Sequence, residues 1–325
     1  MLQTFNPANK DILVNINGRL IHRDEAGISP FDSAVQGGDA VWEGLRVYEG
    51  RIFRLREHLD RLRASAVTLA FAQIPGHEEI TREIRRTLEA NGMRDNVHIR
   101  LTLTRGVKIT SGMDPRLNQS GPTLIVLAEH KVPVYNVAMK GHGTDGEGSP
   151  AGGGLSLITA SVRRFPPDCL DPKVHHCNLL QSILAKIEAN AAGADDAVML
   201  DTRGFVAETN ATHVFIVADG EPVHTPGAPR TVVTPRAVAC PEGITRAAVL
   251  GLCRAHAIPA VERDMSLAEV YRARECFCTG TMGEIAWVSR VDGRTIGDGT
   301  CGPVTTRLRG LFRELTRTEG ERVVE

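Results

Sequence analysis

Residues 41–62, VWEGLRVYEGRIFRLREHLDRL, change their hydrophobic pattern part-way and thereby indicate the fold class. The first part is rich in β-branched and aromatic residues and ends at Glu49-Gly50, which is typical of a strand followed by a tight turn. From Leu55 onward, apolar residues recur every three or four positions, which is the spacing of an amphipathic helix. Strands followed directly by a helix predict an α+β arrangement.

The flanking sequence extends this pattern in both directions. Asn17-Gly18 separates two short apolar runs, which predicts a β-hairpin, and residues 76–93 predict a second helix ending at Asn91-Gly92. Beyond residue 155, short strands in meander order are interrupted by a few helices. This order predicts a β-barrel-like α+β domain rather than alternating βαβ units. The expected helices cover 178–193, 243–257 and 302–315, and residues 275–281 predict a strand that contains Cys276 and Cys278. Capping boxes are expected at Asn178 and Gln181 and at Ser266 and Glu269, and Leu180, Ile183, Leu184 and Ile187 form the apolar face of the first of these helices.

One compositional break divides the chain. Residues 139–154, MKGHGTDGEGSPAGGG, are rich in glycine and have no apolar periodicity, which is typical of a linker or surface loop. We therefore expect a small α/β domain over residues 1–133, an interdomain linker over 134–154 and a larger domain over 155–325.

The bulk composition excludes several classes of function. The formal net charge is -1 and the sequence pI is about 6.8, which gives no footprint for nucleic acid or a membrane surface. No apolar run approaches the length of a membrane span, and the N-terminal sequence does not resemble a signal peptide. The seven cysteines include no C-x-x-C pair, so we expect free thiols and a cytoplasmic protein.

The segment 170–189, LDPKVHHCNLLQSILAKIEA, concentrates residues that can carry chemistry. Lys173 is either a solvated charge or a lysine that forms a Schiff base, which requires a partly desolvated amine. Lys186 is the rival, but its place in the predicted helix is typical of a surface lysine. His175, His176 and Cys177 are unfavourable as joint metal ligands, because consecutive residues of an extended chain alternate faces. We expect no metal, and expect the histidines to line or adjoin a pocket.

Several later residues suit an anionic ligand that carries an aromatic ring. Glu208 lies between two predicted strands, and a carboxylate beside a pyridine nitrogen keeps that nitrogen protonated. Ile244 and Thr245 begin a predicted helix whose free N–H groups favour an anion. The turn at 278–284, CTGTMGE, also offers backbone N–H groups. Arg61 can bind a phosphate through two nitrogens. Each of these four features, taken alone, has an ordinary structural explanation.

Taken together, these segments resemble the class IV aminotransferases, the pyridoxal-phosphate enzymes of fold type IV. That family includes branched-chain amino acid aminotransferases, D-amino acid aminotransferases and aminodeoxychorismate lyases. The resemblance runs from about residue 12 to 316. The segments that carry it are 31–62, 178–189, 193–217, 243–246, 275–285 and 291–305. It implies a small α/β domain, a larger pseudo-barrel domain, pyridoxal 5'-phosphate between them, and a homodimer.

The resemblance also implies roles for individual residues. Lys173 is similar to the lysine that bonds the cofactor, and Glu208 to the carboxylate at the pyridine nitrogen. Arg61, Ile244, Thr245 and Thr281 resemble the residues that bind the phosphate. For the substrate, the resemblance implies Arg100 together with Thr281 and Met282, which lie in the turn that offers N–H groups to a carboxylate.

The chain departs from the family pattern around the lysine. In the family the lysine precedes the asparagine of the next helix by three or four residues, whereas Lys173 precedes Asn178 by five. The strict match is position 174 or 175, occupied by Val174 and His175, and neither forms a stable aldimine. We therefore expect a one-residue bulge between Lys173 and Asn178. Leu179 stands where the branched-chain branch usually has tyrosine.

The expected function is amino transfer between an amino acid, with the branched-chain type favoured, and a 2-oxo acid. Leu179 and the two histidines leave D-amino acids or an (R)-amine open. A lyase of the same family is the alternative within enzymes. A non-catalytic homologue that binds a ligand or partner is the alternative from another class, and a metal hydrolase built on His175, His176 and Cys177 is the remote third.

Overall fold

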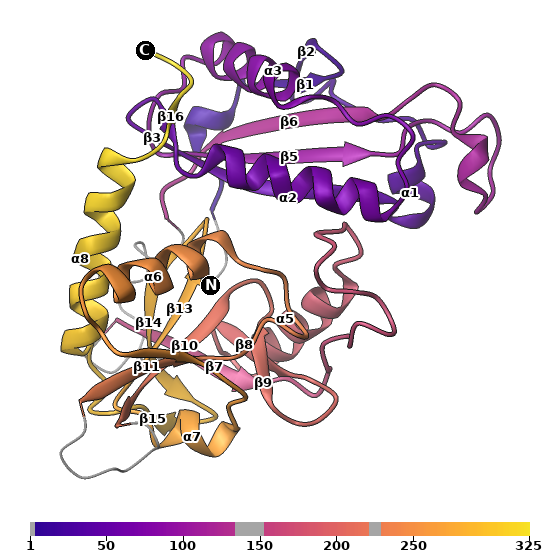
Figure 1. Cartoon of the computed structure of the whole chain (residues 1–325). Helices are drawn as coiled ribbons and strands as arrows, with labels where there is room; N and C mark the ends of the chain where they lie inside the picture. The colour runs from indigo at the N-terminus through magenta and orange to yellow at the C-terminus, as the bar shows by residue number, and fades with distance from the viewer. Residues whose placement is uncertain (1–3, 134–152, 221–228) are drawn as a thin grey trace. The chain divides into compact units, whose positions relative to one another are not determined.

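The computed structural model describes residues 4–133, 153–220 and 229–325. The expected linker over 134–154 lies outside the described residues except for its last two positions. The chain forms two compact units (Figure 1). The smaller comprises Thr4–Val132, Lys173–Leu179 and Thr316–Glu325, and the larger comprises the described parts of Pro133–Pro172 together with Leu180–Leu315.

The smaller unit is built on a seven-stranded sheet with the order β16-β4-β3-β5-β6-β1-β2. Its strands are β1 (Leu13–Ile16), β2 (Arg19–His22), β3 (Ala40–Tyr48), β4 (Arg51–Ile52), β5 (Val97–Thr104), β6 (Thr123–His130) and β16 (Glu321–Arg322). Its helices are α1 (Ser33–Gly37), α2 (Leu55–Thr68) and α3 (His77–Ala90). The predicted hairpin is confirmed, with Asn17 and Gly18 both at positive φ as a tight two-residue turn requires.

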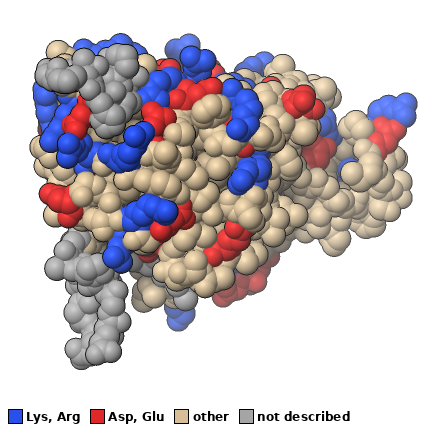
Figure 2. All heavy atoms as spheres, turned by 90° about the horizontal axis from the view of Figure 1, so that it is seen from below, with Lys and Arg blue, Asp and Glu red and all other residues tan. Residues whose placement is uncertain are grey.

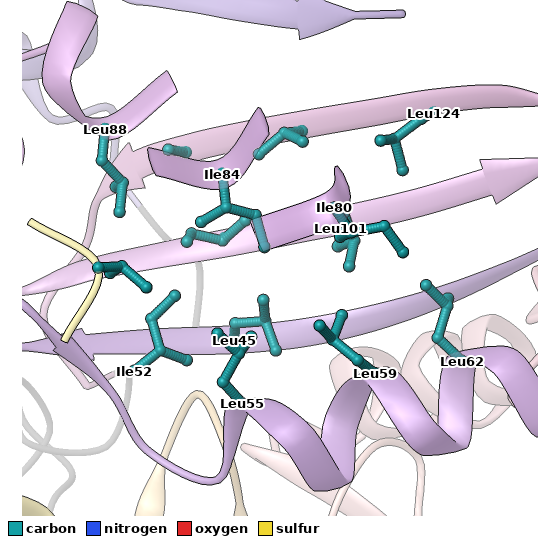
Figure 3. Close-up of a cluster of buried hydrophobic side chains, with 14 of the residues drawn as sticks. Leu45, Ile52, Leu55, Leu59, Leu62, Ile80, Ile84, Leu88, Leu101 and Leu124 are labelled. Atoms are coloured by element: carbon teal, nitrogen blue, oxygen red, sulfur yellow. The ribbon is translucent and has the colours of Figure 1, made fainter. Parts of the chain in front are cut away.

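One face of this sheet carries the hydrophobic core. Leu45 of β3 pairs with Ile99 of β5, so alternate residues of the central strands point to the same side. Leucines of α2 and isoleucines of α3 meet these strand residues, as Figure 3 shows. The predicted helices over 55–69 and within 76–93 are both confirmed. The opposite face of β3 and β5 presents Trp42, Arg46 and Arg100 instead of aliphatic side chains.

The segment Lys173–Leu179 belongs to the smaller unit because it pairs with β3. The Trp42 N–H donates to the His175 carbonyl at 3.0 Å, and the Cys177 N–H donates to the Ala40 carbonyl at 2.9 Å. These two bonds frame a regular antiparallel bridge between Val41 and His176. The backbone of His175 is therefore held at the edge of β3, and the bulge expected between Lys173 and Asn178 stays a prediction.

The larger unit contains a nine-stranded sheet, ordered β12-β11-β10-β13-β14-β7-β8-β9 with β15 paired to β14. Its strands are β7 (Leu155–Thr159), β8 (Asp196–Leu200), β9 (Val206–Thr209), β10 (His213–Asp219), β11 (Arg230–Thr234), β12 (Ala260–Glu262), β13 (Glu275–Gly280), β14 (Glu284–Val291) and β15 (Arg294–Thr295). Its helices are α5 (Leu180–Ala191), α6 (Ile244–Ala255), α7 (Leu267–Tyr271) and most of α8 (Pro303–Thr318). The predicted α+β class is confirmed.

Helix α5 buries small residues and exposes large ones. Ala185 and Ala189 are fully buried, whereas the apolar residues expected to face a core are exposed. These exposed residues are Leu180, Ile183, Leu184 and Ile187. The capping box expected between Asn178 and Gln181 is wrong, because Asn178 donates to the Gly38 carbonyl and Gln181 to the Arg163 carbonyl.

Charges on the surface are mixed in sign. On the face drawn in Figure 2, basic and acidic side chains lie interspersed among uncharged ones. Within the described ranges, no helix combines the length and the apolar character needed to span a bilayer. Each of the seven cysteines lies in the described residues and is a free thiol.

Candidate active site

A buried carboxylate organises the smaller unit. Glu43 points from β3 into the helix-covered face, with none of its surface exposed. Arg61 of α2 binds it through two nitrogens, Nε to Oε1 and Nη2 to Oε2, both at 2.7 Å. His58 Nδ1 lies 2.6 Å from Oε2. Burial raises the pKa of Glu43, but the neighbouring His175 and Arg61 outweigh burial and hold this pKa well below 4.5. Glu43 is therefore an ionised carboxylate inside the unit.

His175 is the fourth member of this cluster. Its Nδ1 lies 3.2 Å from Glu43 Oε1, and its ring stacks on Trp42 with 4.3 Å between the ring centroids. Its backbone N–H donates to Ser65 Oγ at 3.0 Å. Burial lowers the pKa of His175, and the attraction of Glu43 offsets this only in part. The imidazole is therefore neutral at pH 7, and the contacts with Glu43, Trp42 and Ser65 fix its position.

The other side chains of the segment have different partners. Arg100 lies over the Trp42 ring at 3.5 Å and directs Nη2 toward Cys177 Sγ at 3.8 Å. His176 Nδ1 accepts the backbone N–H of Asn178 at 3.1 Å. His175, His176 and Cys177 therefore do not converge, and the described residues contain no cluster of His, Cys, Asp or Glu that could hold a metal ion.

Of the two lysines considered from sequence, neither side chain is buried in this cluster. Lys173 begins the paired segment and is exposed. Lys186 lies on α5 and its Nζ donates to the Asp195 carbonyl. The predicted substrate arginine, Arg100, lies on β5 of the smaller unit, and Arg61 directs two of its nitrogens to Glu43. The cofactor and substrate roles given to Lys173, Arg61 and Arg100 stay predictions.

A second buried carboxylate lies in the larger unit. Glu208 on β9 is 3% exposed and forms an ion pair with Arg164. Arg164 also donates to Ser182 Oγ at 3.2 Å and to the Ala239 carbonyl at 3.4 Å. The other oxygen of Glu208 lies 3.8 Å from His213 Nδ1. The guanidinium of Arg164 supplies the positive charge that an ionised carboxylate needs when it is buried.

His213 links Glu208 to the other predicted residues of the larger unit. It is paired with Thr279 across β10 and β13. A Cβ added to Gly243 would lie 2.2 Å from the His213 ring, so the start of α6 approaches the ring closely. Gly243 is the N-cap of α6 and provides no side-chain capping bond, which leaves the helix N-terminus at Ile244 and Thr245 suited to an anion.

The turn between β13 and β14 completes this group. Thr281 and Met282 lie in the turn, directly after Thr279-Gly280. The Thr279 hydroxyl is buried without a hydrogen-bond partner among the described residues. A buried carboxylate, a helix N-terminus, a short turn and an unsatisfied hydroxyl thus gather around one histidine. This arrangement suits an aromatic ring with a basic nitrogen and an attached anion.

The family model for Amino-transferase class IV matches residues 40–291. The chain belongs to the class IV aminotransferases. This match includes both buried carboxylates and the segment that contains Lys173 and His175. The family membership expected from the ordered segments is thereby confirmed.

Two relatives and one solved structure place this class IV aminotransferase more closely. The branched-chain-amino-acid aminotransferase-like protein 2 of Arabidopsis thaliana is 50% identical over 97% of the chain, which spans 52% of that relative. A putative branched-chain-amino-acid aminotransferase of Methanocaldococcus jannaschii is 37% identical over 96% of the chain and 99% of the relative. The crystal structure of the T.th. branched-chain amino acid aminotransferase complexed with N-(5'-phosphopyridoxyl)-L-glutamate is 33% identical, has a TM-score of 0.81 and covers 95% of this chain and 96% of that one. The chain therefore spans about half the length of its Arabidopsis relative, and the expected fold type is confirmed.

Four residues that organise the two carboxylate clusters were not predicted from the sequence. Glu43, His58, Arg164 and His213 each lie in one of the two carboxylate clusters. Glu43 carried a usable signal, because it interrupts the apolar alternation of Val41 and Leu45 on the buried face of β3. The partners of Glu43 come from α2 and the segment 173–179, and no local pattern links these segments.

Proposed function

We propose that this chain is a pyridoxal-phosphate-dependent aminotransferase that moves an amino group between an amino acid of the branched-chain type and a 2-oxo acid. The observation that carries the proposal is the convergence of Glu208, the start of α6 and Thr279 on His213. The names of the relatives support the branched-chain assignment.

The residues of the larger unit fit the cofactor. When bound, pyridoxal phosphate supplies an electron-withdrawing ring that makes the substrate's Cα proton removable. The N–H groups at Ile244 and Thr245, with Thr281, bind the phosphate, and Arg61 is proposed to join them. Glu208 would accept a hydrogen bond from the protonated pyridine nitrogen, and Arg164 pairs with this carboxylate.

The substrate carboxylate is proposed to bind Arg100 and the backbone of Thr281 and Met282. Arg100 suits this role because Trp42 holds the plane of its guanidinium, which reduces the freedom lost when a carboxylate binds. Burial lowers the pKa of Arg100 without discharging it. A partly buried cation whose position is fixed binds a carboxylate more strongly than a solvated cation does.

The test begins with cofactor binding by the purified chain. Titration with pyridoxal phosphate should reach saturation, and L-leucine with 2-oxoglutarate should then give glutamate. A panel of D-amino acids tests the alternative stereochemistry, and pyruvate release without an amino acceptor would identify a lyase. A chain that binds no pyridoxal phosphate would contradict the proposal.

We further propose a homodimer in the cytoplasm. The exposed apolar face of α5, with Leu180 66% and Ile187 56% exposed, suits contact with a second copy. Ile183→Asp should convert the dimer to a monomer in light scattering, while Val67→Asp on α2 serves as an exposed apolar control. A monomeric wild-type chain would contradict the dimer. The free thiols support a reducing compartment.

A further inference from the structure

The segment that should supply an amine instead holds an imidazole in the buried cluster. A lysine that bonds a carbonyl must be desolvated, so that its amine is neutral. Lys173 is exposed, whereas His175, two residues later, is 14% exposed at its side chain and faces Glu43. Lys186 is the other lysine of this stretch. It lies on α5 and donates to the Asp195 carbonyl.

The surroundings of His175 are those of a general base. Glu43 lies at Nδ1, which favours the tautomer with the proton on Nδ1 and leaves the lone pair on Nε2. The described residues give Nε2 no hydrogen-bond partner. Stacking on Trp42 and the backbone bonds to Trp42 and Ser65 fix the ring. Burial lowers the pKa of His175, so the imidazole is a base at neutral pH.

We propose that His175 transfers the substrate proton and that neither Lys173 nor Lys186 bonds the cofactor covalently. This inference rests on the proposed function. Nε2 accepts the proton from the substrate's Cα, while the electron pair of the broken C–H bond stays with the substrate's conjugated system. Glu43 stabilises the imidazolium. Nε2 then releases the same proton in the second half of the shift, so the histidine ends neutral.

Reductive trapping tests the covalent part. The wild-type chain saturated with pyridoxal phosphate is treated with sodium borohydride, which converts a protein C=N bond to a stable amine, and its peptides are weighed by mass spectrometry. We expect no phosphopyridoxyl mass on Lys173 or Lys186 in the wild-type chain, and none on Lys186 in Lys173→Ala. His175→Lys should gain the adduct at position 175, and the adjacent His176→Lys is the matched control that should not.

Proton exchange tests the role of the base. Loss of the L-leucine Cα proton to D2O, followed by NMR with the cofactor-loaded protein, should slow on the order of 10²–10⁴-fold in His175→Gln. His176→Gln should retain the wild-type rate. Equal pyridoxal phosphate affinity in both variants shows that the fold and the cofactor site are intact.

The outcomes separate this inference from the proposed function. An adduct on Lys173 that disappears in Lys173→Ala, or unchanged exchange in His175→Gln, would overturn the role of His175 and leave the aminotransferase intact. A wild-type chain that does not bind pyridoxal phosphate would overturn both.

Discussion

Glu43 and Glu208 are both buried glutamates paired with an arginine and a histidine, yet their surroundings differ. Glu43 receives two nitrogens of Arg61 and lies beside two histidines, so several groups share its negative charge. Glu208 is paired with Arg164 at one oxygen, and its other oxygen lies 3.8 Å from His213. Arg164 also donates to Ser182 Oγ and to the Ala239 carbonyl.

The difference suits a structural role for Glu43 and the proposed cofactor-binding role for Glu208. Glu43 joins β3, α2 and the segment 173–179, so its loss should disturb the smaller unit. Glu208 is paired with Arg164 and lies 3.8 Å from His213, whose ring is approached by the start of α6, a helix N-terminus that suits an anion. Its loss should therefore affect the chemistry more than the fold.

Glu208→Gln should have the largest effect of the four changes, and the effect is a lower rate of amino transfer. The neutral amide cannot hold a pyridine nitrogen protonated, so the rate should fall on the order of 10²–10³-fold. Stopped-flow absorbance of the cofactor with L-leucine measures this rate. The exposed Glu314→Gln is the control, and a Glu208→Gln protein with the wild-type rate would remove Glu208 from the site.

Glu43→Gln should instead reduce stability. It removes the buried carboxylate charge that pairs with Arg61, which costs about 3–5 kcal/mol. Urea unfolding followed by Trp42 fluorescence, in a Trp287→Phe background, reports on the smaller unit. The exposed Glu89→Gln should change the free energy of unfolding by less than about 0.5 kcal/mol. If Glu43→Gln unfolds like the Glu89 control, Glu43 is not the organising residue.

A pH series distinguishes Glu43 from a buried neighbour on the other face of the sheet. Burial, with the charges of Lys131, Arg46 and Arg100, lowers the pKa of His98 to about 3 from 6.5. The unfolded chain therefore binds a proton between these values that the folded chain does not, so His98 reduces stability by about 1.4 kcal/mol per pH unit as the pH falls from 6.5 toward 3. Glu43 acts in a lower window, because its contribution is complete above 4.5 and is lost as the pH falls through its depressed pKa.

Unfolding midpoints at several pH values between about 7.5 and 5 measure this effect. His98→Gln should remove the slope attributable to His98, whereas the exposed His256→Gln should keep it. An identical pH dependence in wild type and His98→Gln would show that His98 titrates normally.

Arg61→Lys should have the smallest effect of the four. Lysine keeps the charge beside Glu43 but loses the two-nitrogen geometry, which should cost about 1 kcal/mol. The exposed Arg63→Lys on the same helix is the matched control. Tm by calorimetry compares the two variants, and equal values would show that the charge of Arg61 matters more than its shape.

Local sequence patterns were sufficient to predict the fold class and the order of the elements. The hairpin at Asn17-Gly18, the helix from Leu55 and the strand that contains Cys276 and Cys278 depend on local periodicity and turn chemistry, which neighbouring residues dictate. Of the two capping boxes expected, the one at Ser266 and Glu269 formed. The one at Asn178 did not, because the carbonyls of Gly38 and Arg163 accept hydrogen bonds from its side chains.

Which titratable side chains lie close together, by contrast, is visible only in the folded chain. Lys173 and His175 are two positions apart and chemically plausible, but the pairing of their segment with β3 fixes the His175 backbone and brings its ring to Glu43. Arg164 and Glu208 are likewise separated in sequence by a helix and a strand. Such contacts depend on long-range packing, in which desolvation makes a buried charge stable only beside its partner, and no local sequence pattern encodes that pairing.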